Sequence, residues 1–322
     1  TAPAVTEALH GAVARGLTGY LPPYERAQVA RSLAGLSARR YGWQVDPGTV
    51  RLVPDVLAAL RLAAQRLAPG SPILLPTPGY MPFVSEPPGW GHQVHEVPMV
   101  VGTAGGATFD LAAIDAALGA GARLLVLVNP HNPTGRVHTA DELRAVAEVV
   151  DRHGALVFAD EIHAPLVLGG RRHVPYASVS DRARAHSVTA TSASKGWNVA
   201  GLACAQVVIP SPDLLAAWDA GPDGAHGVST LGAVAAIAAY DAGEAWLEQL
   251  CGYLEGNATA LAEVLAERAP AVRYSRPEGT YLAWLDLRGA LPPRAAGVAP
   301  GALARWLRHE SGVAATDGAR CG

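Results

Sequence analysis

The sequence predicts an α/β fold, in which a large domain with a mainly parallel sheet flanked by helices precedes a smaller α+β domain. Two observations support this prediction. Short apolar runs alternate with amphipathic stretches along the chain, and one complete strand–helix–strand unit can be identified. The length of 322 residues, of which 50% are hydrophobic and 16% charged, is sufficient for a large core and about two domains.

Short apolar runs predict the strands of the sheet. Five runs have this character: 73–75, 124–128, 155–159, 188–191 and 205–209. Most of their residues are apolar, which is typical of strands that are covered by helices on both faces. We therefore expect these runs to form the buried part of a mainly parallel sheet.

A helix is expected between the second and third of these runs. Thr139 and Glu142 have the spacing of a capping box, in which each side chain bonds the backbone of the other residue. Apolar residues follow at helical spacing, and Gly154 stands where a helix terminator is expected. The two runs and this helix form the strand–helix–strand unit.

The C-terminal part is expected to contain a long helix, a strand and a loop. Residues 231–240 are rich in alanine and, continuing to Leu250, predict a long helix that joins the two domains. Residues 279–285 predict a strand of the second domain, and residues 289–301, rich in Pro, Gly and Ala, predict a loop.

The expected division of the chain has three parts. Residues 1–25 form an N-terminal segment, which is an arm or belongs to the small domain. Residues 26–236 form the large domain, and residues 237–322 form the small C-terminal domain.

Composition and charge argue against several classes of function. The net charge of -3 argues against nucleic-acid binding, which favours a basic face. The 11 histidines are scattered, and neither HExxH nor CxxC occurs, so no metal site is expected. Three widely separated cysteines favour a reducing cytoplasm over a disulfide scaffold. Because no apolar run approaches the roughly 20 residues that span a bilayer, no contact with a membrane is expected.

The chain contains a single lysine, Lys195, among 25 lysine and arginine residues. Arginine can replace lysine in surface ion pairs but not where a neutral amine must form, because a guanidinium stays protonated. The remaining lysine therefore suggests a chemical role such as Schiff-base formation. Chance survival of a surface lysine is the alternative.

Three polar residues follow neighbouring strands of the predicted sheet. Asn132 comes after the run 124–128, Asp160 ends the run 155–159, and Lys195 follows the next run. In open α/β sheets, ligands bind at the carboxyl ends of the strands. An amine, an acid and an amide at that edge suit pyridoxal 5′-phosphate (PLP). The lysine would hold its aldehyde, the acid would pair with its pyridine nitrogen, and the amide would donate to its ring oxygen.

The motifs around these residues resemble a known superfamily. NPHNPTG at 129–135, the aspartate of ADEIH and SASKGWNVAG at 192–201 are similar to the three motifs of fold-type I PLP enzymes in the class I/II aminotransferase superfamily. DEIH, SK-x-W-N-x-AGL and GTYLAWLDLR resemble more closely the MalY/PatB-like cystathionine β-lyases (C–S lyases). The likeness extends over nearly the whole chain.

The resemblance implies roles for the residues nearest the reacting atoms. Lys195 would be the Schiff-base lysine and the proton-transfer base, and Asp160 would pair with the pyridine nitrogen. Asn132 and His163 would hydrogen-bond the ring oxygen, and Tyr80 would stack on the ring face. His163 as an ordinary buried histidine and Tyr80 as a core aromatic are the alternatives.

The resemblance also implies a phosphate site and a partner. Ser192 and the amides of Asp55 and Val56, at a helix start, would bind the phosphate. The alternative for Asp55 is an ordinary acid in the first turn, whose side chain only interacts favourably with the helix dipole. Tyr20 would reach the phosphate of a partner subunit in a homodimer, although a plain surface position is the alternative.

Two departures from the superfamily pattern affect these expectations. Many aminotransferases have a phosphate-binding arginine where this chain has Ala203, and the lyase subgroup often lacks it. The resemblance also implies about thirty residues before Thr1 and a strand beyond Gly322 that bears the arginine for the substrate carboxylate. The carboxylate-binding arginine is therefore not identified.

The function implied is cleavage of L-cystathionine or a related cysteine S-conjugate by β-elimination, in the cytoplasm. DEIH, Ala203 and Trp197 favour this lyase over the alternative, an aminotransferase that acts on an L-amino acid and a 2-keto acid. A regulatory or binding protein with this fold is a further alternative. The SxxK pattern at Ser192–Lys195 also occurs in penicillin-recognising enzymes, but those need a second lysine.

Overall fold

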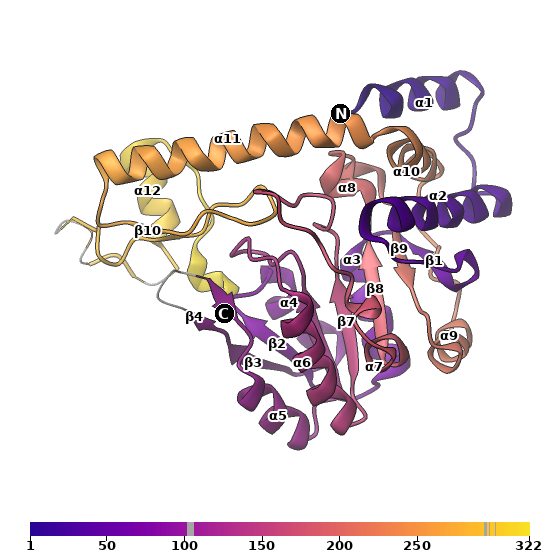
Figure 1. The fold of residues 1–322 in the computed structure, drawn as a ribbon, viewed down its shortest axis with the longest axis horizontal. Helices are drawn as coiled ribbons and strands as arrows, with labels where there is room; N and C mark the ends of the chain where they lie inside the picture. The colour runs from indigo at the N-terminus through magenta and orange to yellow at the C-terminus, as the bar shows by residue number, and fades with distance from the viewer. Residues whose placement is uncertain (102–105, 293–294, 296, 300) are drawn as a thin grey trace.

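The structure is a computed structural model that describes residues 1–101, 106–292, 295, 297–299 and 301–322. A seven-stranded sheet with the order β1-β9-β8-β7-β6-β2-β3 forms its centre (Figure 1). The strands are β1 (Val50–Val53), β2 (Ile73–Thr77), β3 (Val94–Pro98), β6 (Leu124–Val128), β7 (Leu156–Asp160), β8 (Ser187–Thr191) and β9 (Ala205–Val208). Five neighbouring strands, from β8 to β3, are parallel, whereas β9 is antiparallel to both β8 and β1. The predicted mainly parallel α/β sheet is confirmed.

The five predicted strands are all present, and the two that the sequence did not indicate lie at the edges of the sheet. In β3 the residues are mostly half-buried or exposed, and β1 carries the partly exposed Arg51. Because edge strands need only one covered face, they lack the continuous apolar character of the central strands.

Helices cover both faces of the sheet (Figure 1). Ile73 and Leu75 of β2 pack in a core cluster with α3 (Val56–Leu67) and with Trp218 of α9 (Pro212–Asp219). The residue between them, Leu74, packs on the opposite face. That face is covered by α5 (Leu111–Gly119) and α6 (Ala140–Arg152). Successive strand residues therefore enter two separate cores, as expected for a sheet between two helix layers.

The remaining elements lie at the ends of the chain and between the strands. The other helices are α1 (Pro3–Ala14), α2 (Pro23–Tyr41), α4 (Met81–Ser85), α7 (Asp181–Ala185), α8 (Ala193–Gly196), α10 (Thr230–Ala242), α11 (Glu244–Arg268) and α12 (Leu303–Ser311). Two small antiparallel pairs are formed by β4 (Val100–Val101) with β5 (Ala107–Thr108), and by β10 (Arg273–Tyr274) with β11 (Leu285–Asp286). Helices α1 and α2 both pack against α10.

The predicted capping box is present at the start of α6. The Thr139 hydroxyl accepts a hydrogen bond from the Glu142 amide at 3.3 Å, and the Glu142 carboxylate accepts one from the Thr139 amide at 2.7 Å. Gly154, with φ of +55°, lies just beyond the end of this helix. The helix and the two strands that it joins confirm the predicted unit.

The predicted single helix from 231 to Leu250 is wrong, because the chain breaks at Gly243 between α10 and α11. The indole Nε1 of Trp197 donates a hydrogen bond to the Gly243 carbonyl at 3.0 Å. The Trp197 ring, which is fully buried, also occupies the space beside the Gly243 Cα. A distant side chain therefore determines where α10 ends.

The predicted strand over 279–285 is also wrong, apart from its last residue. Only Leu285 and Asp286 form β11. Thr280 has φ of +70°, and its amide bonds the carbonyl of Leu166 rather than a neighbouring strand. Within 289–301 no α-helix or strand is described, and residues 293, 294, 296 and 300 lie outside the described part.

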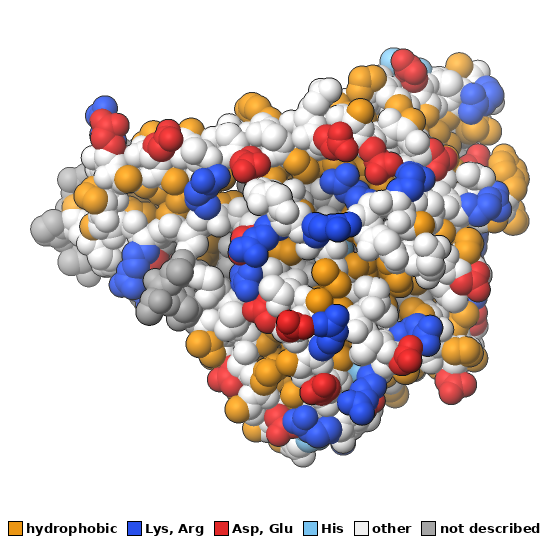
Figure 2. Space-filling view, viewed as in Figure 1, with side chains coloured by type: hydrophobic (Ala, Val, Ile, Leu, Met, Phe, Trp, Pro, Cys, Tyr) orange, Lys and Arg blue, Asp and Glu red, His pale blue; other side chains and the backbone are white. Residues whose placement is uncertain are grey.

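The division at residues 25 and 236 stays a prediction. A boundary after residue 236 would fall inside α10. Within the described residues, no helix has the length and apolar character to cross a membrane. On the face shown in Figure 2, basic and acidic side chains are interspersed rather than gathered into a basic patch.

Replacement of Gly243 by alanine is expected to lower the free energy of unfolding by about 1–3 kcal/mol. The new Cβ would lie 2.5 Å from the Ala239 carbonyl oxygen and would clash with the Trp197 indole. Urea denaturation measures the change. Gly252→Ala in α11 is the matched control, because a Cβ there meets nothing within 4 Å and should stabilise the helix by roughly 0.5–1 kcal/mol. Equal effects of the two variants would contradict this account of the break.

Candidate functional site

A cavity of about 280 Å³ opens at the carboxyl edge of the central strands. Eight of the nine residues predicted for the site line it: Asp55, Val56, Tyr80, Asn132, Asp160, His163, Ser192 and Lys195. The sheet order explains this convergence, because β6, β7 and β8 are adjacent and parallel and therefore end at one edge. The ninth residue, Tyr20, lies elsewhere.

Asp160 is the last residue of β7 and is only 5% exposed. Its Oδ1 accepts a hydrogen bond from the Ile162 amide at 3.1 Å. Burial raises the pKa of its carboxyl to about 7, against the opposing effects of that hydrogen bond and of the Lys195 charge. A buried carboxyl of this kind is strongly favoured in its ionised form by a cationic ligand group placed beside it.

His163 lies three residues after Asp160 and is 3% exposed. Burial, with a smaller effect of the Lys195 charge, lowers the pKa of its imidazole to about 3, so the ring is neutral at pH 7. Its buried Nδ1 has no hydrogen-bond partner among the described residues. Since buried nitrogens normally have partners, this one is suited to a polar ligand.

Two helix starts border the end of the cavity near β8 and β9. Asp55 is the N-cap of α3, and its Oδ1 accepts a hydrogen bond from the Ala58 amide at 2.7 Å. The Asp55 carboxylate is thus used at the start of the helix, which agrees with the alternative that only the amide of Asp55, and not its side chain, binds a ligand. Ser192 caps α8: its hydroxyl accepts from the Ser194 amide at 3.1 Å and donates to the Cys204 carbonyl at 2.7 Å. The start of a helix favours anions such as phosphate.

The sequence did not identify eight further residues that line the cavity: Pro54, Leu57, Phe83, Ile162, Ser194, Ala200, Cys204 and Ala205. Phe83 packs edge-on against Tyr80, with ring centroids 5.2 Å apart, and its position three residues later in α4 was an available signal. Cys204 and Ala205 had no such signal. They reach the cavity because β9 is antiparallel, so that its beginning lies where the other strands end.

Tyr20 and Trp197 do not line the cavity of this chain. The Tyr20 side chain is fully exposed, while the preceding Gly19 carbonyl accepts a hydrogen bond from the Thr230 hydroxyl at 2.7 Å. Trp197 is buried against Tyr240 and bonds Gly243. Trp197, one of the three features expected to favour a lyase, is therefore a packing residue that does not line the cavity.

These residues fit PLP. The cavity contains one amine, one buried carboxyl, an amide side chain and a neutral imidazole, and two helix starts border one end. Lys195 is the only lysine or arginine among the lining residues, so the phosphate would depend on hydroxyl and backbone donors. The cavity volume is close to the lower end of the range typical of small-molecule sites, roughly 300 Å³.

Comparisons with known proteins agree with this geometry. The family model for aminotransferase class I and II matches residues 1–322. A cystathionine β-lyase from Corynebacterium glutamicum is 36% identical over 329 residues, which cover 100% of this chain and 83% of the relative. The cystathionine β-lyase PatB from Bacillus subtilis is 33% identical and is matched over 88% of this chain and 73% of its own.

A solved structure is also similar. The PLP-bound C–S lyase from Staphylococcus hominis superposes with a TM-score of 0.88 at 25% identity, covering 99% of this chain and 80% of that one. The expected resemblance to PatB-like C–S lyases, the fold type and PLP as the cofactor are confirmed by these comparisons.

The buried carboxyl of Asp160 should make the cofactor-free protein less stable as the pH rises from about 5 to about 8. Between the usual carboxyl pKa of 3.8 and about pH 7, the native state keeps a proton that the unfolded chain has lost, so the free energy of unfolding falls as the pH rises. Above about pH 7 both states have lost the proton, and the decrease ends. In the Asp160→Asn variant, the side chain at this position is uncharged at every pH. Its free energy of unfolding, minus that of the wild type, should increase by roughly 2–3 kcal/mol between pH 5 and pH 8. Urea denaturation at both pH values measures this, and an unchanged difference would contradict the raised pKa.

Proposed function

Because this chain belongs to the class I and II aminotransferase family, we propose that it is a PLP-dependent C–S β-lyase. It would cleave L-cystathionine or a related cysteine S-conjugate to a thiol, pyruvate and ammonia. The observation that carries this proposal is the cavity itself, which the single lysine and a buried carboxyl line together with Asn132 and His163. The similarity to proteins named cystathionine β-lyase supports the choice of reaction.

The residues of the cavity divide into those that hold the cofactor and one that moves protons. Bound PLP supplies an electron sink for the α-carbon of an attached amino acid. Asp160 would pair with the pyridine nitrogen, while Asn132 and His163 would hydrogen-bond the ring oxygen. Tyr80 would cover one face of the cofactor ring, and the Phe83 ring packs edge-on against the Tyr80 ring.

The phosphate would be held where helices begin. Ser192 and the backbone amides of Asp55 and Val56 border the cavity at this end. For Ser192 to donate to a phosphate, its hydroxyl must give up the hydrogen bond to the Cys204 carbonyl. The Asp55 carboxylate would remain the cap of α3.

Lys195 would carry the proton transfer. Its amine would remove the proton from the α-carbon of the substrate, and the electron pair left there would expel the thiolate from the β-carbon. An aminotransferase would use the same amine to return that proton to a different carbon, and a keto acid would leave. The position of Ala203, beside lining residues Ala200 and Cys204, adds no arginine to the phosphate end.

A spectroscopic assay distinguishes the two reactions. The PLP-loaded protein is mixed with L-cystathionine without a keto acid, and both pyruvate and the cofactor absorbance are followed. Many-fold excess of pyruvate over enzyme, with the starting spectrum restored, is expected for the lyase. Lys195→Ala should lower this rate by at least about a thousandfold, because the proton-transfer base is lost. Bleaching after a single turnover, reversed by a keto acid, would instead establish an aminotransferase.

We further propose that the protein is a cytoplasmic homodimer in which Tyr20 reaches the phosphate in the partner subunit. The exposed Tyr20 and Tyr24, together with Val13, give this end of the chain an apolar surface, which supports contact with a second copy. Three free cysteines support a reducing compartment.

Mixing two inactive variants tests the role of Tyr20. If Tyr20 acts across the interface, a dimer of one Lys195→Ala and one Tyr20→Ala subunit contains one intact site. Unfolding and refolding an equal mixture should then restore about a quarter of the wild-type activity, because half of the dimers are mixed. Sedimentation checks that dimers form. Activity no higher than the sum of the separate variants would show that Tyr20 does not complete a partner's site.

A further inference from the structure

Residues 278–281 from the C-terminal part of the chain are fixed against the two loops that carry Asn132 and His163. The amides of Glu278 and Gly279 donate hydrogen bonds to the Gly135 carbonyl at 2.8 and 2.9 Å. The next amide, that of Thr280, donates to the Leu166 carbonyl at 2.8 Å. The segment is therefore held by the same loops that place Asn132 and His163 in the cavity wall.

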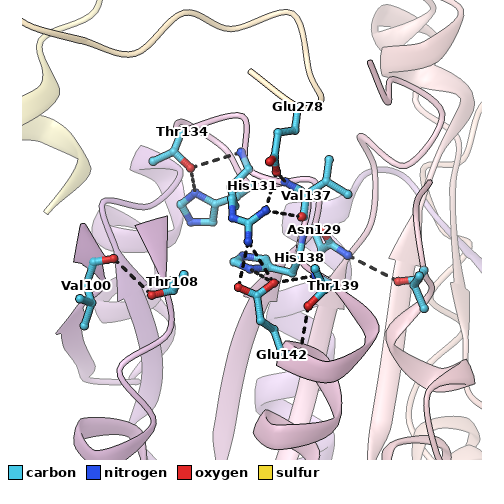
Figure 3. Close-up of polar contacts among 12 residues, drawn as sticks. Val100, Thr108, Asn129, His131, Thr134, Val137, His138, Thr139, Glu142 and Glu278 are labelled. Atoms are coloured by element: carbon cyan, nitrogen blue, oxygen red, sulfur yellow. Dashed lines mark hydrogen bonds and ion pairs between the residues drawn. The ribbon is translucent and has the colours of Figure 1, made fainter. Parts of the chain in front are cut away.

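The Glu278 side chain strengthens this attachment. Its Oε2 accepts hydrogen bonds from the Arg136 guanidinium at 2.6 Å and from the Val137 amide at 2.9 Å, and Figure 3 shows the carboxylate directed at Val137. Its Oε1 accepts from Arg171 at 2.6 Å. Arg136 also pairs with Glu142 at 3.0 Å, so these four charges balance one another. Each of these four charged side chains is therefore paired with another one of opposite sign.

The backbone conformation at Thr280 is unusual. Thr280 is fully buried and has φ of +70°, a region that β-branched residues rarely adopt. Such a conformation is energetically unfavourable, and it persists because the surrounding structure enforces it. The strained backbone at Thr280, bonded to the loop after β7, fixes the direction of the side chain that follows it.

That side chain is Tyr281. Its ring lies edge-on to the His163 ring, with centroids 5.6 Å apart, and it remains 47% exposed. His163 lines the cavity, whereas Tyr281 stands outside it. Tyr281 therefore presents an aromatic surface at the rim, next to the wall formed by the loop after β7.

We propose that Tyr281 determines specificity by contacting the substituent on the sulfur of the substrate, and that it favours an apolar, above all an aromatic, substituent. This proposal rests on the lyase function. A cavity of about 280 Å³ that also holds a cofactor cannot enclose a large substrate, so the sulfur substituent must extend past the rim. The substrate amine must stay near Lys195, and a tyrosine side chain offers no cation for an ion pair with the substrate carboxylate. The thiol part is what remains for Tyr281 to contact.

Two substrates that differ only in the sulfur substituent test the proposal in the PLP-loaded enzyme. For wild type and Tyr281→Ala, kcat/KM is measured with S-benzyl-L-cysteine and with S-methyl-L-cysteine through pyruvate formation. Tyr281→Ala should lower the ratio of the two values about tenfold, the size of an aromatic contact. Tyr281→Phe should keep the ratio within about twofold. Inhibition by 3-(benzylthio)propanoate, which has no amine to react, should weaken about tenfold in Tyr281→Ala.

Tyr253→Ala is the matched control, because Tyr253 is an exposed tyrosine of α11 that does not line the cavity. It should change neither ratio nor inhibition. Equal losses with both substrates in Tyr281→Ala would mean that Tyr281 only supports His163, and the proposal would be wrong. If wild type releases pyruvate from L-cystathionine but not from S-benzyl-L-cysteine, the proposed preference for an aromatic substituent is wrong. If it releases pyruvate from none of the three, the lyase function itself fails, which is a different result from an unchanged ratio.

Discussion

The site depends on a carboxyl group buried at the end of β7. Asp160 is almost inaccessible to water, and the pKa of its carboxyl is raised by that burial. Burying an acid without a cationic partner is costly, so the position makes physical sense when a ligand brings positive charge. The rest of the site is arranged around this carboxyl: adjacent parallel strands end near Asp160, two helix starts border the cavity, and a lysine lines it.

Much of this arrangement could be predicted from the sequence, for physical reasons that can be named. The central strands are covered on both faces and are therefore apolar throughout, and the capping box at Thr139 is a local signal. Residues that follow parallel strands lie at one edge of the sheet, and Asn132, Asp160 and Lys195 come together there because β6, β7 and β8 are also neighbours in the sheet. The edge strands β1 and β3 lack such a signal.

The parts that the sequence could not predict are determined by contacts between distant segments. The end of α10 depends on the Trp197 ring, and the path of residues 278–281 depends on carbonyls at Gly135 and Leu166. Cys204 enters the cavity because of the direction of β9. None of these contacts leaves a periodic pattern in the residues that they involve, so propensity and spacing lead to the wrong element there.

The packing of Trp197 on Gly243 also constrains how this sequence can diverge. A side chain larger than hydrogen at position 243 has no room while tryptophan occupies position 197, which is only two residues from Lys195. Among homologous sequences, loss of the glycine should therefore be accompanied by a smaller residue at position 197 and by a shift of the backbone at Ala239, whose carbonyl oxygen a Cβ would also meet. The pair links the helix that carries Lys195 to the start of α11, so that evolution of the C-terminal part is restricted by the segment that lines the cavity.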